Sequence, residues 1–310
     1  MEMCSLDARM EVDGHSGLAS MRAMKEHTHR GSLLSRRFHL VLLHLAEQAR
    51  RDLDAMASRP ERAIHALRTR MKNVRALFLL VKSRIPKPAR KAAAALAGRL
   101  KDAFSEQRDA HVIAALRAKF PSLDDSATGR KSAPPDNGAG KSAKADASSL
   151  IRKVSKLELH GLTWADVFDG YLRSYRAGRK AMKAMKAMKA CERGQTAKAF
   201  HKWRQPVKEM FYQSQVLQPL DGMKQRRSAA ERLSDRLGEM HDLHLLHATA
   251  KRSRAKDALK EIAKQQRALI PAIFRAAEKL FGERPREIER ALDRCVKFHP
   301  LLVSQAVRQT

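Results

Sequence analysis

Two stretches of the sequence place basic side chains along one face of a helix. In each stretch a histidine is followed by an arginine at i+3 and by a lysine at i+7. The first set is His65, Arg68, Lys72 and Arg75, and the second set is His201, Arg204, Lys208 and Tyr212. At about 100° per residue, the side chains of each set fall within an arc of roughly 80° around a helix. Arginine binds phosphate oxygens through paired hydrogen bonds, lysine adds a compact charge, and histidine donates at neutral pH. We therefore interpret the two sets, called the basic stripes below, as phosphate-binding surfaces.

A second pattern follows each basic stripe and indicates an internal duplication. The two copies are Phe104-Ser105-x-x-Arg108-Asp109-x-x-Val112 and Leu237-Gly238-x-x-His241-Asp242-x-x-Leu245. From His65 to Asp109 is 44 residues, and from His201 to Asp242 is 41. A single stripe of this kind is more often a solvated helix face, but its repetition at nearly equal spacing favours a binding function. We expect two helical halves related by a pseudo-two-fold axis. The sequence leaves open whether the stripes line one groove or two separate faces.

The elements that must hold these side chains are all expected to be helices. Apolar residues recur at helical spacing from residue 32, and Pro60 and Pro88 stand where a second and a third helix would begin. The helical pattern ends before Pro121 and resumes near Leu162. Later interruptions are expected at Gly194, Gly222, Pro271, Gly282 and Pro285. No stretch alternates with a period of two, and abundant Ala, Leu, Met, Lys and Arg favour helix over strand. The predicted fold class is all-α, with two helical bundles.

Composition divides the chain into four segments. Residues 1–30 lack sustained periodicity and are expected to form a flexible tail. Residues 121–149 are rich in Ser, Ala, Gly, Asp and Lys and offer almost nothing apolar to bury, which predicts a flexible linker or an insertion. The first helical half then covers residues 31–120, and the second covers residues 150–310.

The net charge of the chain indicates which class of partner it binds. Lys and Arg number 63 against 33 Asp and Glu, which gives a net charge of +30. Because such an excess repels itself in a compact fold, it is best explained by a polyanion: nucleic acid, an anionic membrane surface or a phosphate polymer. The longest uncharged apolar run, residues 38–46, is far shorter than the ~20 residues that a membrane-spanning helix needs. No targeting segment is recognisable and the three cysteines are scattered, so we expect a cytoplasmic protein.

The duplicated pattern resembles a known family. A helical His-x-x-Arg-x-x-x-Lys, followed each time by a Leu-Gly-x-x-(Arg/Asn)-Asp-like element, resembles the CHAD domain, which is named for its histidines and α-helices. The closest part of the match is the string His201-Lys202-Trp203-Arg204, Val207-Lys208 and Tyr212. The run from Arg173 to Lys180 also resembles the basic opening helix of that family's second half. The resemblance covers about residues 31–310 without the linker. It implies two four-helix bundles that bind inorganic polyphosphate on basic helix surfaces, without catalysis.

This resemblance extends the set of expected polyphosphate-binding residues. Besides the two basic stripes, the set contains Arg108, Arg176, Arg179 and Lys180. No cofactor or metal is expected, and a protein that binds polyphosphate should collect on polyphosphate granules. Several positions depart from the family pattern. Lys72-Asn73 replaces what is often an arginine pair, and His241 stands where Asn is usual. Thr69 stands where a small aliphatic residue is usual, and Pro206 lies inside the helix of the second stripe, where it can bend that helix.

Other functions remain possible from the sequence alone. The charge could serve weak, nonspecific nucleic-acid binding, although aromatic residues are only 5% of the chain and leave few rings for base stacking. His241-Asp242 resembles the dipeptide of metal-dependent phosphohydrolases. However, His241, His244 and His247 recur at every third residue, so they drift around a helix and converge poorly on one ion. Without a neighbouring nucleophile or second carboxylate, Asp109 and Asp242 are expected to orient basic residues of their own halves. The prediction is a non-catalytic protein.

Overall fold

The computed structural model describes residues 33–117, 137–190, 197–218, 220 and 222–298. Within these ranges the secondary structure is helical throughout and contains no strand, so the prediction of an all-α fold is confirmed. The first helices are α2 (Leu33–Asp54), η1 (Ala55–Ala57), α3 (Pro60–Leu80), η2 (Lys82–Arg84), α4 (Lys87–Asp102), α5 (Ser105–Arg117) and α6 (Asn137–Ser155). The later ones are α7 (Trp164–Ala190), α8 (Ala197–Leu217), α9 (Met223–Arg252), α10 (Lys256–Phe281) and α11 (Pro285–Phe298).

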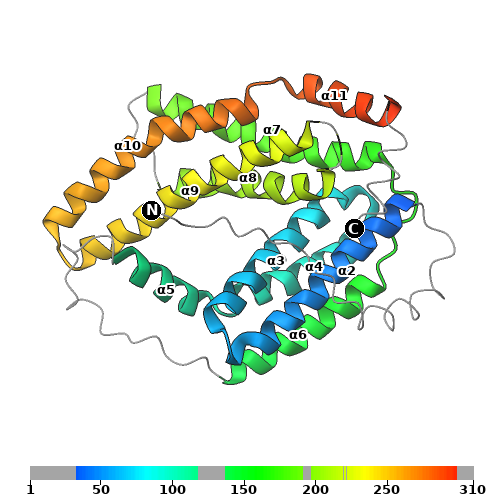
Figure 1. Ribbon diagram of the computed structural model, residues 1–310, viewed down its shortest axis with the longest axis horizontal. Helices are drawn as coiled ribbons and strands as arrows, with labels where there is room; N and C mark the ends of the chain where they lie inside the picture. The colour runs from blue at the N-terminus through cyan, green and yellow to red at the C-terminus, as the bar shows by residue number, and fades with distance from the viewer. Residues whose placement is uncertain (1–32, 118–136, 191–196, 219, 221, 299–310) are drawn as a thin grey trace.

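The helices pack in two groups that meet along one seam. Helices α2, α3, α4 and α6 contact one another, and α7 to α10 form the second group, with α11 on α7. Figure 1 shows these groups as the lower and upper parts of the molecule. Helix α3 joins them by packing against α8 and α7, and α5 reaches α9. Buried apolar side chains of both groups form one continuous core. These contacts do not test whether the groups are duplicates, so the internal duplication remains a prediction.

Local sequence signals set several helix starts. Pro60 and Pro285 occupy the first position of α3 and α11, where the missing N–H costs no hydrogen bond. Gly222 precedes α9 with a φ of 75°, a conformation that glycine adopts without strain. At the start of α7, the Asp166 carboxylate accepts hydrogen bonds from the backbone N–H of Thr163 at 3.0 Å and from its hydroxyl at 2.6 Å. This reciprocal cap satisfies N–H groups that the first turn leaves unpaired.

The structure contradicts the predicted linker over residues 137–149. These residues form most of α6, whose alanine and aliphatic side chains at helical spacing are buried against α2 and α4. The buried side chains are Ala143, Ala147, Leu150 and Val154. Alanine adds little to the apolar composition of a segment, which is why a linker was predicted. Its small side chain nevertheless lets α6 approach its neighbours closely. The boundary at residue 150 was also wrong, because residues 150–155 are the last turns of α6 and belong to the first group. The predicted tail 1–30 and residues 121–136 lie outside the described residues.

Two prolines lie inside helices without ending them. Pro206 is within α8 and Pro271 is within α10, and both helices run past them. The predicted interruption at Pro271 was therefore wrong. Each proline loses one backbone hydrogen bond, but packing of the long helix against its neighbours outweighs that loss. Of the other predicted breaks, Gly222, Gly282 and Pro285 fall at helix ends, and Gly194 lies outside the described residues. None of the described helices has the length and apolarity needed to span a membrane.

Candidate anion-binding site

The two basic stripes lie on helices that face each other. Across the α3–α8 seam, the amide of Gln213 donates to the Ala76 carbonyl at 3.1 Å and the amide of Asn73 donates to the Gln215 side-chain oxygen at 3.4 Å. Near these bonds, burial raises the pKa of Tyr212 to about 12, and the Thr69 side chain on α3 opposes that shift. These bonds hold both stripes at one seam.

Arg68 is held in place by the junction between α4 and α5. Its Nη1 donates to the Lys101 carbonyl at 2.5 Å and to the Ser105 hydroxyl at 2.8 Å. Helix α5 also carries Arg108, which pairs with the adjacent Asp109 at 2.8 Å. Because α5 packs against both α3 and α9, it brings Arg108 to the seam from a third direction.

Two half-buried lysines, one from each stripe, lie near enough at the seam for their charges to interact. Burial lowers the pKa of Lys72 from 10.5 to about 7, with further lowering by the charges of Lys208 and Arg204. Burial likewise lowers the pKa of Lys208 to about 8, with Arg204 adding to the effect and Asp235 opposing it. In the described part of the chain, neither ammonium group forms an ion pair. The seam therefore concentrates positive charge that the protein itself does not neutralise.

Histidines from both halves border the basic residues of the seam. Burial lowers the pKa of His65, and the charges of Lys72 and Lys208 lower it further. The rings of His201 and His241 lie 5.6 Å apart, centroid to centroid. Burial, followed by the charges of Arg204 and His201, lowers the pKa of His241 to about 4. His241 is therefore neutral at pH 7 and contributes hydrogen bonding rather than charge. We name the group the central basic cluster, and its members are His65, Arg68, Lys72, Arg108, His201, Arg204 and Lys208.

The aspartates of the second pattern lie beside this cluster. Asp109 pairs with Arg108 of its own half, as expected. The pKa of Asp242 is raised by burial, while Arg108 and Arg204 lower it. Since these two arginines come from different halves, Asp242 stabilises cations on both sides of the seam and not only in its own half.

Four predicted residues lie away from the cluster. Burial raises the pKa of Glu209 on α8 and the charge of Arg75 opposes that shift, so Arg75 faces a carboxylate. Arg176, Arg179 and Lys180 lie on α7, where Arg179 donates to the Phe281 carbonyl at 3.1 Å. The other two side chains are exposed. No interaction within the described residues links these three to the cluster.

Sequence reasoning did not identify three neighbours of the cluster. Asp235 lies two turns before Asp242 on α9 and offsets the charge of Lys208, and the i, i+7 spacing of these aspartates could have revealed it. Thr69, one of the departures from the family pattern, lies close enough to Tyr212 to affect its pKa. A β-carbon at Gly238 would lie 3.7 Å from the Arg204 guanidinium, an ordinary contact distance, so Arg204 lies against α9 at this position. The Nε of Arg204 is buried and has no hydrogen-bond partner.

The histidines of α9, which are His241, His244 and His247, are not arranged as a metal site in the described part of the chain. The ring of His244 instead packs against Phe200 at 5.8 Å. Across the described ranges, no group of three or more His, Cys, Asp or Glu side chains is placed to hold a metal ion. The arrangement can bind an anion through several charged donors held on rigid helices.

Comparison with known proteins gives one match. A family model described as CHAD domain matches residues 39–251, which is more than half of the chain and includes both basic stripes. No curated protein and no solved structure matches the chain.

Proposed function

Because the chain belongs to the CHAD domain family, we propose that its central basic cluster binds inorganic polyphosphate and does not catalyse its cleavage. One observation carries this proposal: the basic stripes meet at one seam, where Lys72 and Lys208 are both half-buried and neither forms an ion pair with a carboxylate. Burying like charges is costly unless a counter-charge accompanies them. A phosphate chain supplies that counter-charge at regular intervals.

The aromatic residues near the cluster favour a phosphate polymer over nucleic acid. Single-stranded nucleic acid is commonly held by bases stacked on exposed rings, worth about 1–3 kcal/mol per base. Around α8, however, Phe200, Trp203 and Tyr212 are buried in the core. The cluster thus offers charged donors without exposed rings beside them. Collection on polyphosphate granules would follow from such binding.

A competition experiment tests the proposal. Labelled long-chain polyphosphate is bound at near-physiological salt and challenged with unlabelled polyphosphate or duplex DNA. The variant Lys72→Gln/Lys208→Gln is compared with Lys82→Gln/Lys224→Gln, which removes two exposed lysines, one from each group. We expect polyphosphate to compete far better than DNA and only the cluster variant to lose most binding. Equal competition by DNA, with equal losses in both variants, would show that the charge acts diffusely and support nonspecific nucleic-acid binding.

The non-catalytic part has its own test. The protein is incubated with polyphosphate and Mg²⁺ or Mn²⁺, and phosphate release is followed over time. We expect no release above the protein-free rate. Steady release that disappears in Asp242→Asn would instead establish a metal-dependent phosphohydrolase.

A further inference from the structure

A second basic feature lies in the first helix group, between α3, α4 and α6. A cavity of about 540 Å³ opens there, within the range of about 300–1,000 Å³ that is usual for small-molecule sites. Phe78 lines it from α3 and lies six positions after Lys72, about 120° around the helix. The cavity therefore faces away from the central basic cluster.

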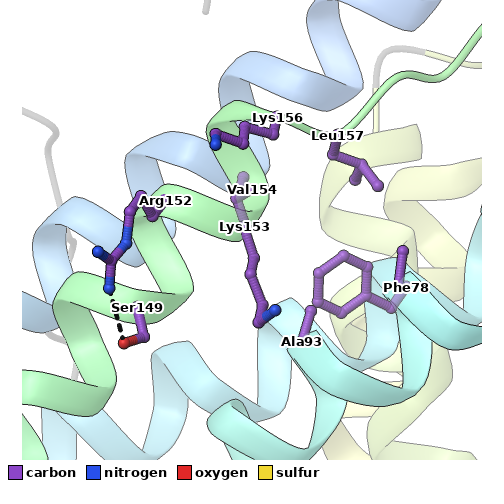
Figure 2. Close-up of a pocket in the computed structure, with 9 residues that line it drawn as sticks. Phe78, Ala93, Ser149, Arg152, Lys153, Val154, Lys156 and Leu157 are labelled. Atoms are coloured by element: carbon purple, nitrogen blue, oxygen red, sulfur yellow. Dashed lines mark hydrogen bonds between the residues drawn. The ribbon is translucent and has the colours of Figure 1, made fainter.

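The floor of the cavity is apolar. Phe78, Ala93, Val154 and Leu157 line it and are each less than a tenth exposed. None of these side chains needs a hydrogen bond. Ala89 and Ala93 line the cavity from α4, and Figure 2 shows Ala93 beside the ring of Phe78. A ligand that covers this floor would remove apolar surface from water, which favours binding.

The wall formed by the end of α6 is basic. Arg152, Lys153 and Lys156 line it, and Arg152 donates to the Ser149 hydroxyl at 3.2 Å. Figure 2 shows Lys153 extending from α6 across the cavity toward Ala93 on α4. Basic side chains at the C-terminus of α6 also complement the helix dipole. The dipole alone does not explain why these side chains line a cavity.

The protein leaves the two lysines of this wall without a counter-charge. Within the described ranges, neither Lys153 nor Lys156 forms an ion pair. The nearest carboxylates along the chain are engaged elsewhere, Asp146 with Arg99 at 2.6 Å and Glu158 with His160 at 2.9 Å. The cavity thus combines an apolar floor with two ammonium groups that are free to pair with an anion.

We propose that this cavity binds a small anionic ligand with an apolar body, such as a carboxylate or sulfonate carried on aromatic rings. The rings pack on Phe78 and Leu157, and the anionic group pairs with Lys153 and Lys156. Polyphosphate has no apolar part and would leave the floor uncovered. The cavity and the central basic cluster therefore select different ligands.

The probe for this proposal is 8-anilinonaphthalene-1-sulfonate, whose fluorescence rises when its rings leave water. It is titrated into the full chain at near-physiological salt. Lys153→Glu/Lys156→Glu is compared with Lys87→Glu/Lys91→Glu, a matched charge reversal at exposed lysines of α4 that do not line the cavity. Ala89→Trp fills the mouth at an exposed position, so it does not disturb the core. N-phenyl-1-naphthylamine serves as the uncharged probe.

We expect the cavity charge reversal and Ala89→Trp each to weaken binding of the sulfonate by about tenfold or more, which corresponds to about 1.4 kcal/mol. The matched reversal should change it less than about twofold, since Lys87 and Lys91 do not line the cavity and salt screens charges that act at longer range. The uncharged probe should bind more weakly than the sulfonate. Lys72→Gln/Lys208→Gln should bind the sulfonate as the parent protein does, whatever becomes of polyphosphate binding. Equal weakening by the two reversals, or unchanged binding in Ala89→Trp, would overturn the proposal.

Discussion

Polyphosphate binding should weaken as the pH rises from 7 to 8. In the free protein, burial and neighbouring cations hold the pKa of Lys72 at about 7 and that of Lys208 at about 8. A bound polyanion favours the charged form of both lysines and raises both pKa values. Polyphosphate binding is then accompanied by proton uptake, so the affinity decreases as the pH increases.

The size of the effect follows from these two values. About half of the Lys72 side chains are protonated at pH 7 and about one in eleven at pH 8, while for Lys208 the fraction falls from about ten in eleven to about half. The affinity should therefore fall by a factor of about five through Lys72 and about two through Lys208, or about tenfold in total. His65 adds little, because burial and the two lysines lower its pKa below 6.5 and leave it mostly neutral in this range. Arg68, Arg108 and Arg204 stay charged throughout.

The variant Lys72→Arg isolates the larger contribution. A guanidinium keeps its charge at both pH values, so the pH effect should shrink from about tenfold to about twofold. The assay is fluorescence anisotropy with labelled long-chain polyphosphate at constant ionic strength, with Lys82→Arg as the control. A parent protein whose affinity is the same at pH 7 and pH 8, or a Lys72→Arg variant that retains the tenfold change, would refute the reasoning.

Further predictions concern salt, stability and packing. Binding through the five arginine and lysine side chains of the central basic cluster should give a log–log slope of affinity against salt of about −3.5 to −4.5, and a slope near zero would exclude this mode of binding. The folded-state pKa values of Lys72 and Lys208 lie below 10.5, so the unfolded chain binds more protons than the folded chain above pH 7. These two groups should therefore raise the thermal midpoint of the free protein between pH 7 and 9. Saturating polyphosphate should reduce that rise. Leu150→Ala should cost about 2–5 kcal/mol in denaturant unfolding, because α6 is packed, whereas a flexible linker would leave stability unchanged. A β-carbon at Gly170 would clash with the Leu80 carbonyl, so Gly170→Ala should lower the melting temperature. A β-carbon at Gly98 meets nothing within 4 Å, so Gly98→Ala should raise it. The same shift in both variants would contradict the α7–α3 packing.

The basic stripes were predictable because they depend only on helical periodicity. Their residues repeat at i, i+3 and i+7, and such spacing fixes a shared face before any tertiary contact is known. The sequence could not show that the two faces meet, because that depends on how α3 packs against α8. The polar bonds of the seam, such as Gln213 to Ala76, join residues more than 130 positions apart.

Helix α6 escaped prediction for a compositional reason. Within residues 137–149 its buried residues are alanines set among Ser, Lys and Gly, so this part of the helix carries little hydrophobic signal. The predicted helix interruption at Pro271 was wrong for the opposite reason. Proline is a strong local signal for a helix break, but the tertiary packing of α10 outweighs it. Asp235 shows a third limit: an aspartate on a basic protein suggests solvated charge until the structure places it near the half-buried Lys208.

The central claim is that both halves build one polyphosphate site, and calorimetric titration with tripolyphosphate tests it most directly. The account predicts one bound tripolyphosphate per chain. Lys72→Gln and Lys208→Gln should each weaken that single event by about tenfold, with the stoichiometry unchanged. Two bound molecules per chain, with each variant removing one and leaving the other at its original affinity, would contradict it.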